Sequence, residues 1–332
     1  MGPRRQIASA LAALLALEVI VACHLTRASS PSSGIVEVRA FAVDLDPKNP
    51  DRKQIGKLVF LSGFELKTSD QRFGGLSGLW ISEESLVALS DRGYWISARV
   101  RHDADGRLVE FSDWKIERLL APDGQPVSGR LADSEGLTQD QDGSFIVSFE
   151  QVHRLWRYAP TPATFASKPV LIPVPTQLTR APANGGVECV AAIGDGRLII
   201  LTEALRNAHG SLAGWLLEKE QFHSLSYVPS AEFAPSDCAV LKNGDLLVLE
   251  RQIGLLGSWA TRIKKISRDS VRPGARFEGS EIARLALPLA VDNFEGMAVY
   301  EHPQAGTLVY LVTDDNYLSL QRTLLLQFRL TQ

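Results

Sequence analysis

Five short segments of the chain place a polar side chain at the same point of a repeated pattern. In each segment a polar or acidic residue precedes a small residue and then an apolar one. The polar residues are Ser77, Glu135, Glu188, Asp237 and Glu295, at steps of 58, 53, 49 and 58 residues. If the repeat closes on itself, the four carboxylates of Glu135, Glu188, Asp237 and Glu295 meet in one ring. Such a ring suits a hard divalent cation, because calcium prefers oxygen ligands of this kind.

A second set of carboxylates ends the β-rich run that follows each segment. These acids are Asp91, Glu150, Glu203, Glu250 and Asp314. Arg92 and Arg251 come directly after two of them, where a guanidinium can clamp an anionic substrate or stabilise developing charge. The same arginines can instead pair with the acids and serve structure alone. Each single acid can likewise cap a strand edge or accept backbone hydrogen bonds.

The residues between these acids predict strands joined by tight turns. Runs such as Leu198–Glu203 and Leu246–Glu250 are aliphatic up to a final acid, which is typical of buried strands. Asp140–Gly143 and Lys242–Asp245 supply the Asp-Gly and Asn-Gly chemistry of hairpin turns. Three or four strands in each repeat of about fifty residues favour a β-propeller over a sandwich. The chain is therefore expected to be an all-β protein with mostly four-stranded antiparallel blades.

The number of blades follows from the number of motifs. Five motifs predict five blades, and six blades are the alternative if the N-terminal strands form one of their own. The strand-like runs Val36–Val43 and Ile55–Phe64 precede the first motif. One of them is expected to pair with Leu324–Leu330 and close the ring.

A propeller would bring both sets of acids to one mouth of its central channel. The innermost strand of each blade borders the channel, and the start of that strand lies beside the end of the next antiparallel strand. Up to nine carboxylates would then repel one another, which raises their pKa values unless a cation compensates. Calcium is the expected ion. Zinc is disfavoured, because no histidine or cysteine pair has the spacing of zinc ligands.

Cys189 and Cys238 stand where three of the five segments have glycine. Tight packing of the inner strands explains small residues there. A disulfide requires the two side chains to face each other. Equivalent positions on adjacent blades point the same way around the ring, so the sequence argues against a Cys189–Cys238 bond.

The N-terminus has the features of an export signal. Arg4 and Arg5 precede an apolar run, and Ile20–Cys23 resembles a lipobox whose cysteine is lipidated. We expect a signal peptide over residues 1–23, a linker over 24–34 and the propeller over 35–332. The protein would be periplasmic or anchored to the outer membrane as a lipoprotein, and otherwise secreted. With a net charge of −3 and no basic stripe, no nucleic-acid partner is expected, and we expect a monomer that meets a membrane only through its lipid anchor.

Several of these segments together resemble the phytase-like family, whose bacterial members are described by an esterase-like activity of phytase. The resemblance rests on Phe73–Leu79 with Ser90–Gly93, on Asp133–Leu137, and on Asn293–Met297 with Thr313–Asn316. It implies a propeller that hydrolyses phosphate or carboxylate esters. The chain lacks the Asp-Asp-Pro-x-x-Trp motif and the basic cluster of β-propeller phytases, so phytate is not the expected substrate.

Two functions follow from these observations. In the first, Glu135, Glu188, Asp237 and Glu295 hold calcium and one of Asp91, Glu150 or Glu203 acts as general base, with Arg92 or Arg251 stabilising charge on a small ester or phosphoester. In the second, the propeller is not catalytic. It binds a ligand or an envelope partner, and the channel ion is structural.

Overall fold

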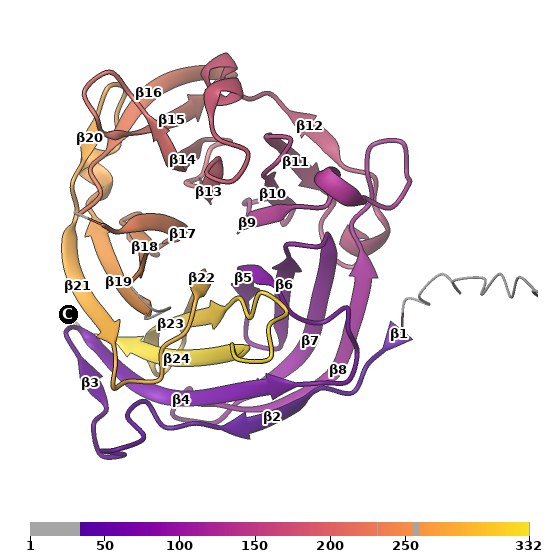
Figure 1. Cartoon of the computed structure of the whole chain (residues 1–332), viewed down its shortest axis with the longest axis vertical. Helices are drawn as coiled ribbons and strands as arrows, with labels where there is room; N and C mark the ends of the chain where they lie inside the picture. The colour runs from indigo at the N-terminus through magenta and orange to yellow at the C-terminus, as the bar shows by residue number, and fades with distance from the viewer. Residues whose placement is uncertain (1–33, 231, 255–258, 332) are drawn as a thin grey trace, which may run out of the picture. The chain divides into compact units, whose positions relative to one another are not determined.

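The structure is a computed structural model that describes residues 34–230, 232–254 and 259–331. These residues form five sheets around a central axis (Figure 1), which confirms the β-propeller and settles the number of blades at five. The signal peptide, the lipobox at Cys23 and nearly all of the linker lie outside the described residues. Within the described part, no helix is long and apolar enough to cross a membrane.

Each blade is built outward from a strand at the channel. Blade 1 has β5 (Leu76–Ile81), β6 (Ser85–Ser90), β7 (Tyr94–His102), β8 (Leu108–Arg118) and β1 (Gly34–Ile35). Blade 2 has β9 (Ser134–Gln139), β10 (Phe145–Phe149), β11 (Arg154–Tyr158) and β12 (Val170–Ile172). Blade 3 has β13 (Val187–Ala192), β14 (Leu198–Arg206), β15 (Leu212–Glu218), β16 (Gln221–Tyr227) and β20 (Arg276–Phe277).

Blades 4 and 5 complete the ring. Blade 4 has β17 (Ala234–Val240), β18 (Leu246–Ile253), β19 (Trp259–Ile266) and β21 (Ser280–Ala286). Blade 5 has β22 (Phe294–His302), β23 (Gly306–Thr313), β24 (Leu324–Leu330), β4 (Leu58–Lys67) and β2 (Arg39–Ala42), with β3 (Gln54–Ile55) beside β4. The connections contain short 3-10 helices at Gly129–Leu131, Thr164–Ala166, Thr176–Arg180 and Arg268–Ser270.

The two ends of the described chain close the ring together. Strand β4, from the N-terminal side, pairs antiparallel with the C-terminal strand β24 from Leu324↔Glu65 to Leu330↔Leu58. One of the two N-terminal runs was expected to close the ring, and Ile55–Phe64 is the run that does so. The earlier run contributes β2 to the outer edge of the same blade, and no sixth blade forms from it.

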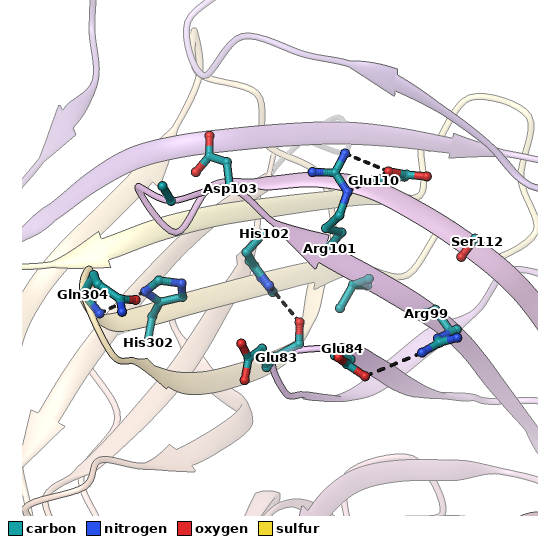
Figure 2. A pocket seen from close by; sticks show the side chains of 12 residues that line it. Glu83, Glu84, Arg99, Arg101, His102, Asp103, Glu110, Ser112, His302 and Gln304 are labelled. Carbon is teal, nitrogen blue, oxygen red and sulfur yellow. Dashed lines mark hydrogen bonds and ion pairs between the residues drawn. The ribbon is translucent and has the colours of Figure 1, made fainter.

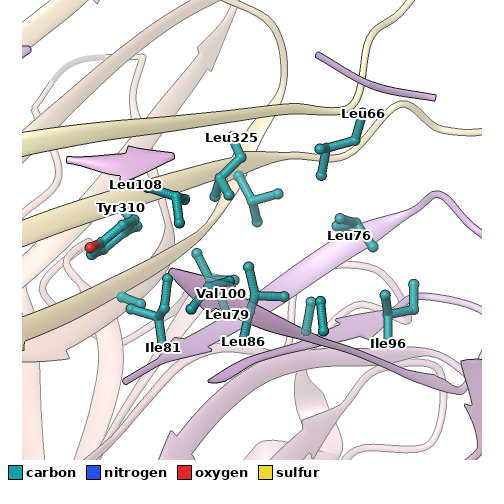
Figure 3. Packing of buried hydrophobic residues seen from close by; sticks show 14 of the residues in the cluster. Leu66, Leu76, Leu79, Ile81, Leu86, Ile96, Val100, Leu108, Tyr310 and Leu325 are labelled. Carbon is teal, nitrogen blue, oxygen red and sulfur yellow. The ribbon is translucent and has the colours of Figure 1, made fainter. Parts of the chain in front are cut away.

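Apolar side chains fill the space between neighbouring blades. Between blades 5 and 1, Leu325 and Tyr310 pack over Leu79, Leu86 and other side chains of blade 1 (Figure 3). Between blades 1 and 2, Trp95 meets Phe145 and Tyr158 with ring centroids 6.1 and 5.1 Å apart. Burying one such large side chain contributes roughly 1.5–3 kcal/mol. The blades are thereby fixed around the channel, and the starts of their inner strands are fixed with them.

Every inner strand carries a β-bulge near its first residues. The register against the second strand shifts around Ser77 in β5, Glu188 in β13, Ser236 in β17 and Glu295 in β22. In β9 the shift lies between Ser134 and Leu137, which brackets Glu135. A bulge leaves one residue out of the ladder and redirects its side chain. The repeated bulge therefore defines which residues are structurally equivalent.

This register corrects the predicted position of Asp237. The bulged residue of β17 is Ser236, so Asp237 occupies the position of Gly78, Gly136 and Gly296 in the other blades. A side chain at that position points into the next blade, since a Cβ on Gly78 would lie 2.8 Å from the carbonyl oxygen of Glu135. Asp237 does the same: its Oδ2 accepts a hydrogen bond from the Met297 N–H at 2.6 Å, across the boundary to blade 5.

The same offset explains why the expectation about the two cysteines is wrong. Cys189 of β13 and Cys238 of β17 form a disulfide between blades 3 and 4. Cys189 stands at the glycine position and points toward blade 4. Cys238 is one residue further along its own strand, and successive side chains of a strand point to opposite faces. It therefore points back toward blade 3, and the two sulfur atoms meet.

Candidate functional site at the channel mouth

Five equivalent residues surround one mouth of the channel, in the second strand of each blade or directly after it. Four are acids, whose backbone N–H groups donate to the carbonyl just before the inner strand: Asp91 to Gly75, Glu150 to Asp133, Glu203 to Gly186 and Asp314 to Asn293. In blade 4 the register pairs Arg251 with Ala234 at this point. The mouth therefore has four acids and one arginine in this tier. In the bulge tier it has Glu135, Glu188 and Glu295 together with Ser77 and Ser236.

Three of the carboxylates at the mouth form a cluster with the dimensions of a metal site. Ligand oxygens of Asp133, Glu135 and Glu150 all lie within 4.8 Å of one another. Asp133 is partly buried, and the other two are buried. Oxygen ligands at these separations fit a calcium ion, which accepts irregular carboxylate coordination.

Glu135 of this cluster and the neighbouring Glu188 have carboxylates without a hydrogen-bond or ion-pair partner among the described residues. Glu135 is 8% exposed and Glu188 is 3% exposed. Neither carboxylate accepts a hydrogen bond or forms an ion pair within the described residues. Burial raises the pKa of both groups well above the usual range. The charges of Glu188 and Glu150 raise the pKa of Glu135 further, and those of Glu150 and Glu203 raise the pKa of Glu188 against the opposing charge of Arg251. Buried carboxylates without donors are costly unless a cation or a proton neutralises them.

Burial also raises the pKa values of three acids in the other tier. Burial raises the pKa of Asp91 to about 7, with the charges of Asp314 and Asp133 adding to the effect. Burial also raises the pKa of Glu150 to about 7, although the N–H groups of Gly185 and Gly186 donate to its Oε1 and oppose the shift. The pKa of Asp314 rises to about 6 by burial, against the Asn316 N–H. Strong perturbation of several acids in one place is typical of a functional site.

Arg251 neutralises the other side of the mouth. Its guanidinium pairs with Glu203 at 3.1 Å and with Glu295, and it donates to Asn293 Oδ1 at 3.0 Å. The Asn293 amide in turn donates to Glu295 Oε1 at 2.6 Å. These contacts use the N–H groups at the tip of Arg251. It therefore holds the acids of blades 3 and 5 in place and is not free for a substrate.

Two predicted acids lie away from the mouth. The carboxylate of Asp237 is fully buried between blades, where the N–H groups of Met297 and Cys238 donate to it at 2.6 and 2.7 Å. Glu250 is also fully buried and accepts hydrogen bonds from Arg262 of its own blade and from Tyr227 of blade 3. Both acids have partners and serve to fix strands.

A glycine brings Asp91 against the loop between β23 and β24. Gly75 has a φ of +59°, and a Cβ there would lie 2.1 Å from Asp91 Oδ1 and 2.7 Å from Tyr317 Cε2. Only glycine fits this conformation and this contact. Asp91 Oδ1 is buried and has no hydrogen-bond partner among the residues that the structure describes. Arg92 does not reach into the channel, because its guanidinium lies flat on the ring of Tyr317, 3.3 Å from the centroid.

Two cavities lie outside the acidic mouth, one in the channel and one on the far side of the propeller. Beyond the mouth, a cavity of about 210 Å³ is lined mainly by apolar residues such as Leu79, Leu137 and Met297. At the opposite ends of β5 and β22, a cavity of about 670 Å³ lies around His102 and His302 (Figure 2). Both of its arginines pair with acids, Arg99 with Glu84 and Arg101 with Glu110. Buried carboxylates with strongly raised pKa values gather instead at the acidic mouth.

The structure brings together part of the predicted site and adds one residue to it. Asp133 joins Glu135 and Glu150 although it was not among the predicted ligands. Its position two residues before Glu135 is the available signal, since alternate residues of an extended chain share a face. The separation between residues of the two tiers also indicates that Arg251 takes the place of an acid in blade 4. Ser236 and Arg251 are 15 residues apart, as are Glu135 and Glu150, whereas Asp237 and Glu250 are 13 apart.

A five-bladed propeller with a mouth of buried carboxylates defines the class of protein. The family described as "Phytase-like: Esterase-like activity of phytase" matches residues 71–317. This match covers most of the 332-residue chain, and the chain belongs to this family. No curated protein matches the chain at a significant level.

Several solved structures match most of the length of this chain and are remote in sequence. An α-L-arabinofuranosidase from Podospora anserina, in complex with cellotriose, is 10% identical, with 89% of this chain and 97% of that chain covered and a TM-score of 0.49. The catalytic domain of a Coprinopsis cinerea α-L-arabinofuranosidase is 13% identical, with 82% and 97% covered and a TM-score of 0.45. A luciferin-regenerating enzyme is 11% identical, with 79% and 93% covered and a TM-score of 0.42.

Proposed function

We propose that the protein is a calcium-dependent hydrolase of phosphate or carboxylate esters that acts at the acidic channel mouth. The observation that carries this proposal is the pair Glu135 and Glu188, two buried carboxylates without a hydrogen-bond donor or an ion-pair partner among the described residues. The mouth holds seven carboxylates in its two tiers against the single guanidinium of Arg251. A divalent cation supplies the charge that this arrangement lacks.

Asp133, Glu135 and Glu150 are the residues proposed to hold the ion, with Glu188 beside them. Calcium bound there would polarise the ester oxygen and lower the pKa of a coordinated water. The predicted ligand Glu295 is instead paired with Arg251, and Asp237 is enclosed between blades. Calcium fits this site better than zinc does, because the cluster offers only carboxylate oxygens.

Asp91 is the proposed general base. Of the three acids predicted for this role, Glu203 is paired with Arg251, and Glu150 belongs to the cluster and accepts two backbone hydrogen bonds. Asp91 keeps Oδ1 without a partner, and its pKa of about 7 suits proton transfer near neutral pH.

The experiment is an assay of the purified protein with p-nitrophenyl acetate and p-nitrophenyl phosphate, with calcium and with EDTA. We expect turnover that requires calcium and that falls by at least about a hundredfold in Glu135→Gln and in Asp91→Asn. The matched control is Asp103→Asn, which changes an acid on the far side of the propeller. Calcium that raises the melting temperature without turnover of either ester would instead identify a binding module with a structural ion.

We also propose that the protein is exported. The proposal rests on the N-terminal sequence pattern and on the Cys189–Cys238 disulfide, because such bonds persist mainly in oxidising compartments. Fractionation of the native host tests it, with labelled palmitate to detect a lipidated Cys23. Recovery of the protein in the cytoplasm with both thiols free would refute it.

A further inference from the structure

A third cavity, of about 620 Å³, adjoins the acidic mouth at blades 1 and 5. Three segments form its walls: the residues between β4 and β5, the turn after β6, and the loop between β23 and β24. In Figure 1 the last of these is the yellow loop that lies over β5 and β22. Arg92, Tyr317 and Arg322 line the cavity together with polar side chains. The proposed function assigns no role to this cavity. The side chains that line it can therefore indicate a further group of the substrate.

Arg92 presents a free guanidinium edge to this cavity. Its stacking on Tyr317 uses only the flat face of the group, and its side-chain N–H groups have no hydrogen bond or ion pair within the described residues. The Tyr317 ring is itself fixed, because its hydroxyl bonds to Ser90 Oγ at 2.7 Å and to the Gly74 carbonyl at 3.0 Å. Stacking on an aromatic ring holds a guanidinium in place and leaves its in-plane donors available.

The loop that carries Tyr317 is shaped to hold this arrangement. Asn316 and Tyr317 have φ values of 47° and 52°, and this left-handed conformation is unfavourable for a tyrosine. Asp315 fixes the loop by accepting hydrogen bonds from the N–H groups of Gly75 and Tyr317, both at 3.0 Å. Strain held by specific contacts is typical of ligand-binding positions.

Most other charges around the cavity are already paired. Lys67 pairs with Glu65 at 2.8 Å, and Asp70 pairs with Arg72 at 2.6 Å. Arg322 lies 3.8 Å from Asp292, and Asp315 also accepts from Thr323 Oγ1 at 2.8 Å. Among the described residues that line the cavity, Arg92 is therefore the cation without an ion-pair partner, whereas the carboxylate of Asp315 is occupied by N–H and hydroxyl donors of its own loop and of Gly75.

The cavity and the proposed catalytic acid share one wall. Asp91 Oδ1 and the Tyr317 ring both pack against Gly75, at 2.1 and 2.7 Å from where its Cβ would stand. Arg92 is the next residue after Asp91. A substrate whose ester reaches Asp91 can therefore place a neighbouring group against Arg92.

We infer that this cavity binds a carboxylate or phosphate group of the substrate that is separate from the ester being cleaved, and that Arg92 holds this group through two parallel N–H···O bonds. The inference rests on the proposed function for the position of the scissile ester. It assigns Arg92 to substrate recognition and not to stabilisation of the transition state. The preferred substrates would be esters with a second negative charge, because a guanidinium edge matches a carboxylate or phosphate and gains nothing from a neutral chain.

Two esters of equal length test the inference: mono-p-nitrophenyl succinate, with a free carboxylate, and p-nitrophenyl butyrate, without one. For the wild type we expect the lower KM with the succinate ester. Arg92→Gln should raise that KM about tenfold and change the KM for the butyrate ester by less than about twofold. The matched control Arg99→Gln, an exposed arginine of the same blade, should change neither. Equal effects of Arg92→Gln on both esters would overturn the inference.

Direct binding separates this inference from the proposed function. Calorimetry with succinate and with methylphosphonate, neither of which can be hydrolysed by the enzyme, should show calcium-loaded wild type binding at least one of them about tenfold more tightly than Arg92→Gln. The tighter of the two identifies the preferred oxyanion. If the Arg92-dependent binding is present and no ester is hydrolysed, the proposed function fails and the subsite stands. Equal binding of both anions by wild type and Arg92→Gln refutes the subsite, whatever the activity.

A change at Tyr317 provides the check against misfolding. Tyr317→Phe keeps the ring under Arg92 and removes only the hydroxyl, whereas Tyr317→Leu removes the ring. At melting temperatures matched to wild type within a few degrees, the leucine variant should lose more anion affinity than the phenylalanine variant. The reverse order would show that stacking does not position Arg92.

Discussion

The guanidinium of Arg251 in blade 4 lies 3.1 Å from the carboxylate of Glu203 in blade 3, measured from Nη2 to Oε1. The same group pairs with Glu295 of blade 5. One side chain therefore links three blades at the point where their acids converge. Arg251 occupies the position that is an acid in each of the other blades. It therefore reduces the net negative charge of the mouth in two ways, by adding a cation and by replacing an anion.

Removal of Arg251 should destabilise the calcium-free protein strongly. In Arg251→Gln the largely buried carboxylates of Glu203 and Glu295 lose their cation, which typically costs about 3–5 kcal/mol. Chemical denaturation in EDTA measures this change in the free energy of unfolding. Calcium should recover part of the loss, because added positive charge then reaches the same acids.

The matched control for that experiment is Arg99→Gln. Arg99 pairs with Glu84 at 3.5 Å, and both side chains are more than half exposed, so the change should stay within about 0.5 kcal/mol. If the two variants unfolded at the same denaturant concentration, the buried network around Arg251 would contribute nothing measurable.

The calcium-free protein should become less stable as the pH rises from about 4 to about 7. Burial raises the pKa of Asp91 from 3.8 to about 7 and that of Glu150 from 4.5 to about 7. Over this window the folded protein keeps protons that the unfolded chain has released. The free energy of unfolding therefore falls with pH and levels off above about 7.

Melting temperatures at intervals between pH 5 and 8, in EDTA and in calcium, measure this dependence. Calcium competes with protons for the same oxygens, so it should stabilise the protein more at pH 8 than at pH 5. Asp91→Asn should give a shallower slope in EDTA, because an amide does not titrate. A slope that Asp91→Asn leaves unchanged would mean that other groups control the pH dependence.

Much of the fold was predictable because the same local sequence pattern recurs in each blade. The aliphatic runs, the turns and the closure of the ring by an N-terminal run all follow from local pattern, and the structure confirms the propeller. The β-bulges were not predicted. A bulge shifts the register by one residue, and one residue decides whether a side chain faces the channel or the next blade. This is why Asp237 and the two cysteines were misplaced.

The candidate site was predictable in outline for the same reason. Glu135, Glu188 and Glu150 lie at the mouth because their blades keep the common spacing. The ion pairs of Glu203 and Glu295 do not follow from this spacing, because Arg251 reaches both carboxylates across blade boundaries. Such contacts depend on side-chain reach between segments far apart in sequence. The stacking of Arg92 on Tyr317, 225 residues away, is another contact of this type.

Calcium affinity should distinguish the acids at the mouth from those between blades. Glu135→Gln removes a charge from the Asp133–Glu135–Glu150 cluster and should weaken calcium binding by on the order of tenfold or more. Asp237→Asn should leave calcium affinity unchanged and cost about 1–3 kcal/mol of stability. An amide has one acceptor for the two N–H groups that Asp237 now satisfies. Calorimetry with calcium gives the affinity, and chemical denaturation gives the free energy of unfolding. Weaker calcium binding by Asp237→Asn would show that Asp237 is part of the metal site.

The disulfide should make a separate contribution that does not depend on calcium. Cys189 and Cys238 close a loop of 49 residues between blades 3 and 4. Constraining the unfolded chain over such a loop stabilises the folded state by about 2–4 kcal/mol. The double variant Cys189→Ala, Cys238→Ala should lose that amount in calcium and in EDTA alike, whereas Arg251→Gln should respond to calcium. Mass spectrometry of a non-reduced digest should show the linked peptides. Free thiols at both positions in the oxidised protein, with unchanged stability of the double variant, would contradict the bond and the register that places it.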